Sequence, residues 1–499
     1  MPLIDLLQSP TAYAHPAESI QVIETHISWV ILTGKFAYKI KKPVDLGFVD
    51  FSTFERRHHF CLEELRRNRA FSDDLYLEVV PITRQGNALQ VGGQGEPIEY
   101  AVKMRQFDGD QLGSQLLKTG QLLPGEIDRL AERVGQIHER AAKAVGQGWG
   151  TADHIRQPAL DNFAALRPLI RESQRLAQLD ELERWTYRHC DHLRQLMDDR
   201  KAAGFVRECH GDLHLGNIVR WRGALIPFDC IEFNPHFYWI DVISEIAFLV
   251  MDLDDHERSD LGWRFLNAWL QASGDYAGMR LLPFYLVYRA LVRAKVCELR
   301  LHQAGLLAIE KQHLAAEWHG YLDMATRYTQ PRPVTLTITH GLSGSGKTWG
   351  TQRLIEQTGQ VRIRSDVERK RIFGVQTLDH SSQEVGEGLY SASAGEATYE
   401  RLETLARGVM KAGFPVVVDA TFLKRERRAR FRRLAVELNV PFQILTFEAN
   451  PAVLRKRILQ RQQESLDASD ATLATLEHQL RIIEPLDAIE QEFAVVSPD

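Results

Sequence analysis

The sequence has 499 residues, which at roughly 100 to 200 residues per domain indicates more than one domain. Hydrophobic residues make up 44% and charged residues 25%, and these values exclude a disordered chain, a collagen-like chain and a small disulfide-stabilised scaffold. The net charge of -5 excludes a global positive field for nucleic acid or an anionic membrane, so any anion site must be local.

Five cysteines are spread along the chain without a CxxC pair: Cys61, Cys190, Cys209, Cys230 and Cys297. Their spacing argues against a disulfide framework and a structural zinc site, and it favours a reducing compartment. The first residues lack the basic and apolar regions of a signal peptide, and no run approaches the roughly 18 apolar residues of a membrane span. We therefore expect a cytoplasmic protein with no membrane partner.

The segment TQPRP at residues 329–333 is typical of a linker, because two prolines lie within three residues. We therefore predict one domain over residues 1–328 and another over residues 334–499. No internal repeat is visible, so the two domains are expected to be unlike.

The first domain begins with strand patterns and continues with helix patterns. Residues 26–40 read as a β-hairpin, and apolar residues at helical spacing over 54–68 place Glu64 beside a buried stripe. Further strands are expected over 75–82 and 100–107, and helices over 127–143, 158–177, 182–202, 242–251 and 281–301. The order predicts a strand-rich lobe followed by a helix-rich lobe.

Residues 210–217, HGDLHLGN, and the following IPFD at residues 226–229 form one chemical constellation. Asp212 is a candidate base that orients and deprotonates an acceptor hydroxyl, while Asn217 and Asp229 are candidate metal ligands. A base and two metal-binding groups at this order and spacing favour phosphoryl transfer over an ordinary polar hairpin.

This constellation resembles the aminoglycoside phosphotransferase and choline kinase group, over about residues 20–325. The resemblance implies an α+β two-lobed protein-kinase-like fold, with Lys39 of FAYK binding the α and β phosphates and Glu64 as its partner. It also implies that residues 100–107 form the hinge beside adenine and that Asp241 braces the catalytic loop.

Several details of this domain stay open. Lys41 and Lys42 compete with Lys39, and their simpler interpretation is a solvated strand end. His210 is expected to brace the loop, whereas His214 either packs or lies beside the phosphate. The hairpin before Lys39 has only Gly34 in place of a glycine-rich loop, which leaves nucleotide binding by this half open.

The second domain alternates strands and helices. Strands are expected over 334–339, 361–365, 416–419 and 442–448, and helices over 349–357 and 425–438. This alternation predicts an α/β fold with a parallel sheet and helices on both faces.

Between the first strand and helix of this domain lies GLSGSGKT, residues 341–348, which matches the phosphate loop GxxxxGK[ST]. Lys347 can reach the β and γ phosphates, and the Thr348 hydroxyl can bind Mg²⁺. The backbone that would cradle the phosphates belongs to Gly341, Leu342, Ser343, Gly344, Ser345 and Gly346. The motif predicts ATP and Mg²⁺ as cofactors.

Charged residues follow the next strands of the same domain. Asp366 can act as base toward an acceptor that Arg369 fixes, and Asp419 can hold Mg²⁺, its water or the acceptor. A later helix, which precedes the segment 465–472, carries three arginines: Arg455, Arg457 and Arg461. This arrangement could close over the transferred phosphate as a lid, and the choice among the three arginines stays open. The basic run over 424–433 is interpreted as a solvated helix surface.

This half resembles the small P-loop kinases, including gluconate kinase, zeta-toxin-like kinases and polynucleotide kinase, over roughly residues 334–499. The resemblance implies that Asp366 is the acceptor-facing base and Arg369 its companion. The order of the halves is similar to a bacterial fusion of an aminoglycoside-phosphotransferase-like domain with a P-loop ATPase or kinase.

The leading hypothesis is a bifunctional ATP-dependent kinase that phosphorylates hydroxyl groups of small molecules. One alternative is that only the P-loop domain is catalytic and that the first domain is a nucleotide-binding sensor or scaffold. Another is a nucleic-acid end kinase, which the negative net charge disfavours.

Overall fold

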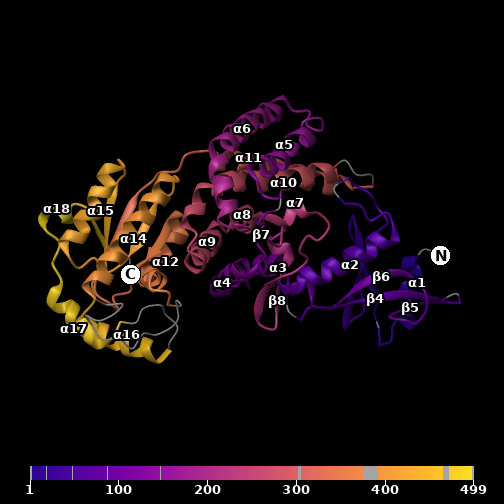
Figure 1. The fold of residues 1–499 in the computed structure, drawn as a ribbon, viewed down its shortest axis with the longest axis horizontal. Coiled ribbons are helices and arrows are strands. Elements are labelled where there is room, and N and C mark those ends of the chain that lie inside the picture. The colour runs from indigo at the N-terminus through magenta and orange to yellow at the C-terminus, as the bar shows by residue number, and fades with distance from the viewer. Residues whose placement is uncertain are drawn as a thin grey trace. The chain divides into compact units, whose positions relative to one another are not determined.

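The structure is a computed structural model that describes residues 3–17, 19–47, 49–72, 74–86, 88–146, 148–301, 305–375, 391–464 and 471–496. The chain forms two compact units (Figure 1). The first unit comprises Met1–Asp252 and Tyr288–Leu322, and the second comprises Leu253–Val287 and Asp323–Asp499.

The first unit opens with a six-stranded antiparallel sheet in the order β1-β2-β3-β6-β4-β5. Its strands are β1 (Gln21–Glu24), β2 (Ser28–Leu32), β3 (Phe36–Lys41), β4 (Tyr76–Gln85), β5 (Ala88–Val91) and β6 (Pro97–Arg105). Helix α2 (Phe54–Asn68) packs against β4 and β6, and the Thr53 side chain caps its N-terminus. The predicted hairpin and the predicted helix over 54–68 are confirmed.

Helices dominate the rest of the first unit. They are α3 (Gly113–Lys118), α4 (Pro124–Arg140), α5 (Ala152–Leu166), α6 (Ser173–Ala202) and α7 (Pro235–Tyr238). Three more helices have residues in both units: α8 (Val242–Asp255), α10 (Leu282–Leu301) and α11 (Ala308–Tyr328). Two small antiparallel ribbons pair β7 (Val206–Glu208) with β10 (Trp239–Asp241) and β8 (Ile218–Trp221) with β9 (Ala224–Pro227). This is the two-lobed protein-kinase-like fold that the sequence predicts.

The helix predicted over 182–202 is confirmed, although it begins earlier than expected, whereas the helix predicted over 158–177 is wrong. The residues predicted as one helix over 158–177 belong to α5 and to the start of α6, which also absorbs the helix predicted over 182–202. Proline is common in the first turn of a helix, and Pro158 is the first residue of the range predicted. It lies instead inside α5, whose true N-cap is Thr151, accepting a hydrogen bond from the His154 backbone N–H.

The second unit contains a five-stranded parallel sheet in the order β12-β13-β11-β14-β15. Its strands are β11 (Leu336–His340), β12 (Val361–Arg364), β13 (Val416–Asp419), β14 (Phe442–Thr446) and β15 (Ala494–Val496). Its helices are α9 (Ser259–Ser273), α12 (Lys347–Thr358), α13 (Ser365–Ile372), α14 (Ala392–Lys411), α15 (Arg425–Glu437), α16 (Pro451–Glu464), α17 (Leu473–Ile482) and α18 (Ala488–Gln491). The predicted α/β fold is confirmed, and the carboxyl ends of β11, β12 and β13 share one edge.

The division into units differs from the predicted boundary at 329–333, because the segment Leu253–Val287 folds with the second unit. Within it, α9 packs against α12 and β12. The Asn267 amide donates to the Gln360 carbonyl at 3.1 Å and accepts from the Arg362 backbone N–H at 2.7 Å. Linker composition marks a turn in the chain, but these long-range hydrogen bonds decide which residues fold together.

The interpretation of 424–433 as a solvated surface is wrong for one residue. Arg428 is 1% exposed and forms a bidentate pair with Glu490, with both N–O distances 2.8 Å. It also donates to the backbone carbonyls of Phe422 and Leu423. Arg428 therefore stabilises the interior of the second unit, since a buried guanidinium requires such partners.

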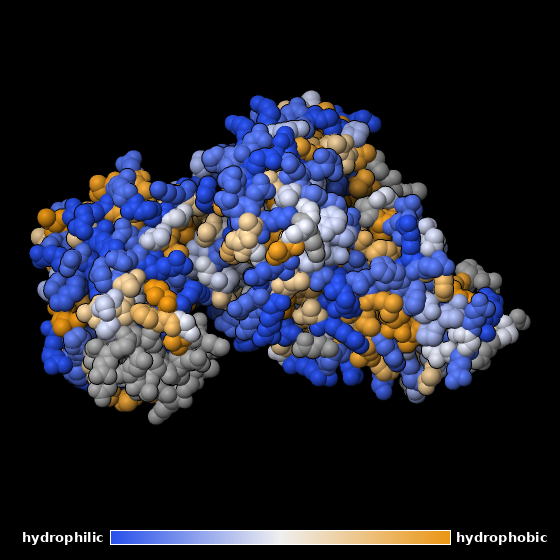
Figure 2. Space-filling model, viewed as in Figure 1, coloured by the Kyte–Doolittle hydropathy of each residue, from blue (hydrophilic) through white to orange (hydrophobic). Residues whose placement is uncertain are grey.

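The face of the protein drawn in Figure 2 is mainly hydrophilic, and its hydrophobic residues lie in separate patches. Among the described residues, no helix is both long enough and apolar enough to cross a membrane.

Candidate functional site

The phosphate loop lies between β11 and α12, at the edge where parallel strands end. Gly344 and Gly346 have φ values of 80° and 95°, which favour glycine, and a Cβ on Gly344 would lie 3.2 Å from the Leu454 carbonyl oxygen. The Lys347 ammonium donates to the carbonyls of Gly341 at 3.0 Å and Leu342 at 2.7 Å. The lysine is thus folded over the loop at the N-terminus of α12, where an anion is favoured.

A pair of oxygen ligands lies beside this loop. The Thr348 hydroxyl donates to the Asp419 carboxylate at 3.1 Å, and Asp419 is 5% exposed at the end of β13. The Thr351 hydroxyl lies 3.4 Å from the same carboxylate oxygen. A hydroxyl and a carboxylate are hard oxygen ligands of the kind that Mg²⁺ prefers, so Thr348 and Asp419 fit that ion.

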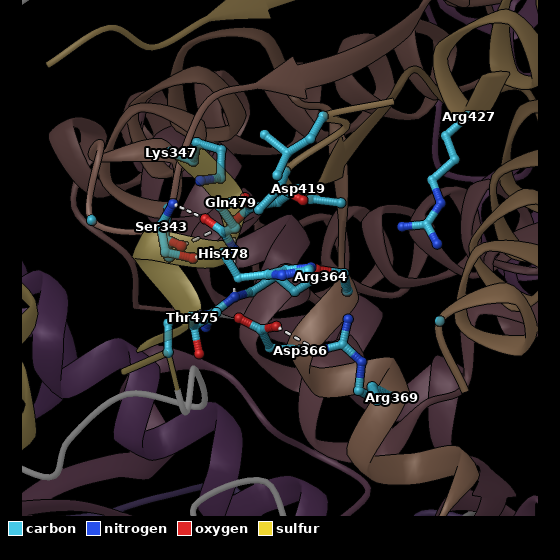
Figure 3. Close-up of a pocket in the computed structure, with 18 of the residues that line it drawn as sticks. Ser343, Lys347, Arg364, Asp366, Arg369, Asp419, Arg427, Thr475, His478 and Gln479 are labelled. Atoms are coloured by element: carbon cyan, nitrogen blue, oxygen red, sulfur yellow. Dashed lines mark hydrogen bonds and ion pairs between the residues drawn. The ribbon is translucent and has the colours of Figure 1, made fainter. Parts of the chain in front are cut away.

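A cavity of about 700 Å³ joins these groups to the acceptor-side candidates. Asp366 and Arg369 lie 3.3 Å apart in α13, and both line the cavity. Figure 3 shows the ion pair of Asp366 with Arg369, together with Lys347 and Asp419, which line the same cavity. The structure therefore brings together the predicted phosphate-binding, metal-binding and base residues of this unit.

The C-terminal helices contribute further groups to the cavity. The Arg457 guanidinium donates to the Gly344 carbonyl at 3.3 Å, whereas Arg455 pairs with Glu477 at 2.8 Å. Of the three lid arginines, Arg457 therefore reaches the phosphate loop. The Arg461 side chain and residues 465–470 lie outside the described residues.

Sequence reasoning missed Gln479 of α17, which contacts the phosphate loop directly. Its carbonyl oxygen accepts from the Ser343 backbone N–H at 2.8 Å, and its amide donates to the Ser343 hydroxyl at 3.0 Å. A glutamine far along a helix has no sequence signal, because only the fold brings it to the loop.

In the first unit, Lys39 of β3 joins two carboxylates. Its ammonium lies 2.8 Å from Glu64 of α2 and contacts Asp229, which follows β9. Asp229 has a φ of 60°, a backbone conformation that non-glycine residues rarely adopt and that is often found at functional sites. The predicted pair of Lys39 and Glu64 is present, and the candidate metal ligand Asp229 lies beside it.

Lys41 is not a solvated strand end, as its simpler interpretation held. Lys41 is 2% exposed and lies 2.7 Å from Glu64, and it also contacts Glu232, which sequence reasoning missed. Burial alone would raise the pKa of Glu64, but Lys39 and Lys41 lower it to about 2. Burial raises the pKa of Glu232 above its ordinary value.

Asp212 and Asn217 meet within the HGDLHLGN loop. The Asn217 amide donates to the Asp212 carboxylate at 2.9 Å, and His214 Nε2 lies 3.4 Å from the same carboxylate. Burial alone would raise the pKa of Asp212, but His214 lowers it below its ordinary value. Asp212 is therefore ionised near neutral pH, as a base must be, and His214 is its neighbour.

Asp241 does not brace the catalytic loop, contrary to the prediction. It forms a bidentate pair with Arg200, at 2.7 and 2.9 Å. Glu245, one helical turn further in α8, instead accepts from the backbone N–H groups of His210 at 2.6 Å and Gly211 at 2.9 Å. Both acids occur in WIDVISEIA, and the sequence alone does not show which one points to the loop.

His210 braces the loop, as expected. It is fully buried, and burial lowers its pKa to about 3, so the ring is neutral. Its Nε2 donates to the Phe228 carbonyl at 2.8 Å, and its Nδ1 accepts from the Asp212 backbone N–H at 3.3 Å. The ring thereby links Asp212 to Phe228, the residue before Asp229.

The turn between β1 and β2 contains only Thr25, His26 and Ile27 and therefore no glycine. The Thr25 hydroxyl accepts from the Ser28 backbone N–H at 2.9 Å and closes the turn. Gly34, in the turn before β3, donates its N–H to the Gln106 side chain at 2.8 Å. A closed turn of this kind offers few backbone N–H groups to a phosphate.

Comparisons with known proteins find matches to a part of the second unit and to nearly the whole chain. A family described as an AAA domain matches residues 336–486. Over 470 residues, the chain is 30% identical to uncharacterized proteins of Mycobacterium tuberculosis and Mycobacterium bovis, covering 93% of this chain and 92% of theirs.

Solved structures similar to the first part of the chain include a choline/ethanolamine kinase family protein from Mesorhizobium loti. The match has 14% identity and a TM-score of 0.41, and it covers 65% of this chain and 96% of that protein. An amicoumacin kinase is also 14% identical, with a TM-score of 0.39, over 64% of this chain and 92% of its own. A gluconokinase from Sinorhizobium meliloti is 22% identical with a TM-score of 0.21, over 34% of this chain and 83% of its own.

Proposed function

This chain belongs to the same family as the two mycobacterial proteins that it matches over 93% of its length, and we propose that it is an ATP-dependent phosphotransferase with two sites, each acting on a hydroxyl group of a small molecule. The observation that carries the proposal is that Lys347, Asp419 and Asp366 line one cavity. These are the groups that phosphoryl transfer requires: a phosphate ligand, a metal ligand and a base.

In the second unit, the loop amides and Lys347 bind the phosphates of ATP, and Thr348 and Asp419 hold Mg²⁺. A Mg²⁺ ion held by Thr348 and Asp419 would supply charge neutralisation for the phosphates. Asp366 accepts the proton of the acceptor hydroxyl, and Arg369, 3.3 Å from it, fixes the acceptor. Arg457, already hydrogen-bonded to the loop, stabilises the negative charge that develops on the transferred group.

In the first unit, Lys39 binds the α and β phosphates and is oriented by Glu64. Asp229 and Asn217 are the ligands for Mg²⁺, since each offers an oxygen atom. Asp212 takes the proton from the acceptor. His214, 3.4 Å from the Asp212 carboxylate, lowers the pKa of that carboxyl and so keeps it ionised. The adenine would lie along β6, within the hinge expected at residues 100–107.

One observation favours an alternative in which only the second unit is catalytic. The turn formed by Thr25, His26 and Ile27 is closed by Thr25 and lacks glycine, so it provides little backbone cover for phosphates. The first unit would then bind nucleotide as a sensor or scaffold.

The nucleic-acid end kinase receives less support, because four basic residues of the run 424–433 pair with carboxylates. These pairs are Lys424 with Glu484, Arg425 with Asp487, Arg428 with Glu490 and Arg430 with Glu396. A surface that binds the phosphate backbone needs unpaired cations.

A calorimetric titration with a non-hydrolysable ATP analogue and Mg²⁺ tests the proposal. We expect two sites in the wild type, loss of one in Lys347→Ala and loss of the other in Lys39→Ala. Thr348→Val should weaken only the Mg²⁺-dependent part of binding in the second unit. A single site that disappears in Lys347→Ala would contradict nucleotide binding by the first unit, under the proposal and under the alternative alike, and no binding at all would contradict the proposal as a whole.

A further inference from the structure

The cavity beside the phosphate loop carries more positive than negative side chains. Two carboxylates among the described residues line it, Asp366 and Asp419. The fixed cations among the described residues that line it are Lys347, Arg364, Arg369, Lys424, Arg427 and Arg457. Walls with an excess of one charge concentrate ligands of the opposite charge. The cavity is therefore suited to negatively charged ligands, and the contacts of each cation indicate which ligand it would meet.

Three of these cations are already engaged. Lys347 and Arg457 donate to backbone carbonyls of the phosphate loop, so they lie where the phosphates of ATP would bind. Lys424 lies 3.0 Å from the Glu484 carboxylate, which offsets its charge.

Two further cations lie beside the carboxylates of the cavity. Arg364 Nε lies 3.9 Å from an Asp419 oxygen, and Arg369 Nη1 lies 3.3 Å from an Asp366 oxygen. Each cation is thereby matched by one negative charge. The remaining cation of the lining is Arg427.

Arg427 has no carboxylate partner among the described residues, unlike Arg425 and Arg428 on either side of it. Its guanidinium carbon lies 4.1 Å from the centre of the Tyr399 ring. The face of an aromatic ring attracts a cation without using its N–H groups, which stay available to an anion. The side chain is partly exposed and lines the cavity (Figure 3), so a ligand can reach it.

Helix α14 supports this guanidinium. A Cβ on Gly395 would lie 3.2 Å from Arg427 Nη2, so the glycine allows the side chain to lie close to the helix. Tyr399 follows four residues later, on the same face of α14, and is 2% exposed. Its ring packs edge to face against Phe422 and Phe431, with ring centres 5.2 and 6.5 Å apart. The guanidinium therefore rests on the core of the unit, and its position does not depend on a ligand.

The same helix places Arg427 on the side of the cavity that carries the base. α14 packs against α13, which carries Asp366, and against α15, which carries Arg427. The phosphate loop is instead contacted by Arg457 of α16 and Gln479 of α17. Arg427 is thus placed to meet the acceptor, whereas Arg457 is placed to meet the nucleotide.

We infer that the acceptor of the second unit is a small alcohol that carries an anionic group, a carboxylate or a phosphate, and that Arg427 binds that group. This acceptor class rests on the proposed function of the second unit. A guanidinium presents two parallel N–H donors that fit two oxygen atoms of either anion. A neutral alcohol would leave this cation without a partner.

The hydroxyl of such an acceptor lies at Asp366 while its anionic group lies at Arg427. Transfer forms a bond between the hydroxyl oxygen and the γ-phosphorus and breaks the bond from that phosphorus to the oxygen that bridges it to the β-phosphate. ADP leaves with that oxygen, and the hydroxyl proton passes to Asp366.

Binding of matched alcohols to the full-length protein, saturated with Mg²⁺ and a non-hydrolysable ATP analogue, tests this inference. The nucleotide fills the phosphate loop, so a second anion must bind elsewhere. The probes are glycerol, glycerate and glycerol 3-phosphate, and the longer series of ribitol, ribonate and ribitol 5-phosphate. In the wild type, a charged probe should bind about tenfold or more tightly than the neutral probe of its series. The two charged members of each series distinguish a carboxylate from a phosphate.

In Arg427→Met, the preference for the charged probes should disappear, and in Arg427→Lys, which keeps the charge but loses the planar fork, part of it should remain. Arg425→Met is the matched control, because Arg425 belongs to the same basic run but does not line the cavity. Nucleotide binding at Lys347 should be unchanged in all three variants. If Arg427→Met no longer binds nucleotide, Arg427 serves the phosphates of ATP or the fold, and the inference is overturned.

Four other results overturn the inference: no saturable binding of a charged probe, equal binding of neutral and charged probes, a preference that survives in Arg427→Met, and an equal loss in Arg425→Met. An oligonucleotide with a 5′-hydroxyl end serves as a polyanion. If it binds more tightly than every charged probe, with the steep salt dependence of phosphate-backbone binding, the small-molecule class is wrong.

Transfer assays separate this inference from the proposed function. Asp366→Asn should keep the preference for charged probes and lose their phosphorylation. In Arg427→Met, KM for a charged acceptor should rise about tenfold or more, with a smaller change in kcat. Charged-probe preference without any transfer by the wild type would contradict the proposed activity of this unit but leave the anion site intact. Transfer to neutral alcohols that Arg427→Met leaves unchanged would overturn the acceptor class alone.

Discussion

The Lys39 ammonium contacts the Asp229 carboxylate, although the two residues lie 190 positions apart in the chain. The contact joins β3 of the strand-rich lobe to the residue that follows β9 of the helix-rich lobe. Because Glu64 also lies 2.8 Å from the Lys39 ammonium, three charges from distant segments converge at one point. Charges cluster in this way where a protein is arranged to bind another charged group.

The buried carboxylate of Glu64 should make the stability of the first unit depend on acid pH. Its pKa is about 2 in the folded protein against an ordinary 4.5, so its stabilising effect is complete above pH 4.5 and declines as the pH falls toward 2. In Glu64→Gln, denaturant melts should show a smaller loss of unfolding free energy across that interval. Equal slopes for the variant and the wild type would contradict the ion-pair account.

Glu245 should control the geometry of the catalytic loop. Glu245→Ala leaves the backbone N–H groups of His210 and Gly211 unpaired in the interior, at a cost of roughly 2 to 5 kcal/mol of unfolding free energy. Glu245→Gln keeps one acceptor oxygen and should recover part of that loss. Turnover dependent on Asp212 should fall in both variants, while nucleotide binding at Lys347 stays unchanged. A melt of Glu245→Ala that matches the wild type would show that the loop does not depend on this acid.

His214 should set the acid limb of the activity that depends on Asp212. Activity requires ionised Asp212, and His214 lowers the pKa of that carboxyl, so the wild type should lose activity only at strongly acid pH. In His214→Gln, burial acts without the opposing charge, and the acid limb of kcat/KM should move to higher pH. His189→Gln in α6 serves as control, because His189 Nδ1 bonds to the Trp185 carbonyl in its own helix. An unmoved acid limb in His214→Gln would argue against Asp212 as the base.

Arg428 should be essential for the stability of the second unit. Arg428→Met leaves the Glu490 carboxylate without its bidentate partner and should cost roughly 3 to 5 kcal/mol of unfolding free energy. Arg425→Met, in the same basic run, removes an exposed pair and should cost about 0 to 1 kcal/mol. Chemical denaturation of both variants checks the contrast, and equal losses would contradict the assignment of Arg428 to the interior.

Sequence reasoning was most successful where spacing along one element sets the geometry. The phosphate loop and the meeting of Asp212 with Asn217 follow from motifs whose residues lie close together in the chain. The pair of Lys39 and Glu64, which lie on β3 and α2, was expected from the resemblance to a kinase family. The predicted neighbours Thr348 and Asp419 follow from the rule that parallel strands end at one edge.

The contacts that sequence reasoning missed depend on packing between distant elements. Glu232 and Gln479 reach their partners only through the fold, and the choice of Glu245 over Asp241 depends on the orientation of α8. Residues 253–287 fold with the second unit because Asn267 bonds to Gln360 and Arg362. Local periodicity carries no information about such partners.

The most direct test of the account is Mg²⁺-dependent ATP turnover by the wild type, Asp212→Asn and Asp366→Asn across a panel of sugars, amino alcohols, apolar alcohols, aminoglycosides and oligonucleotide ends. The account predicts that small alcohols stimulate turnover and that each substitution removes stimulation by a different acceptor, by roughly 100-fold or more. Loss of all stimulated turnover in Asp366→Asn, with no change in Asp212→Asn, would contradict a catalytic first unit. Stimulation by oligonucleotide ends alone would contradict the small-molecule account as a whole.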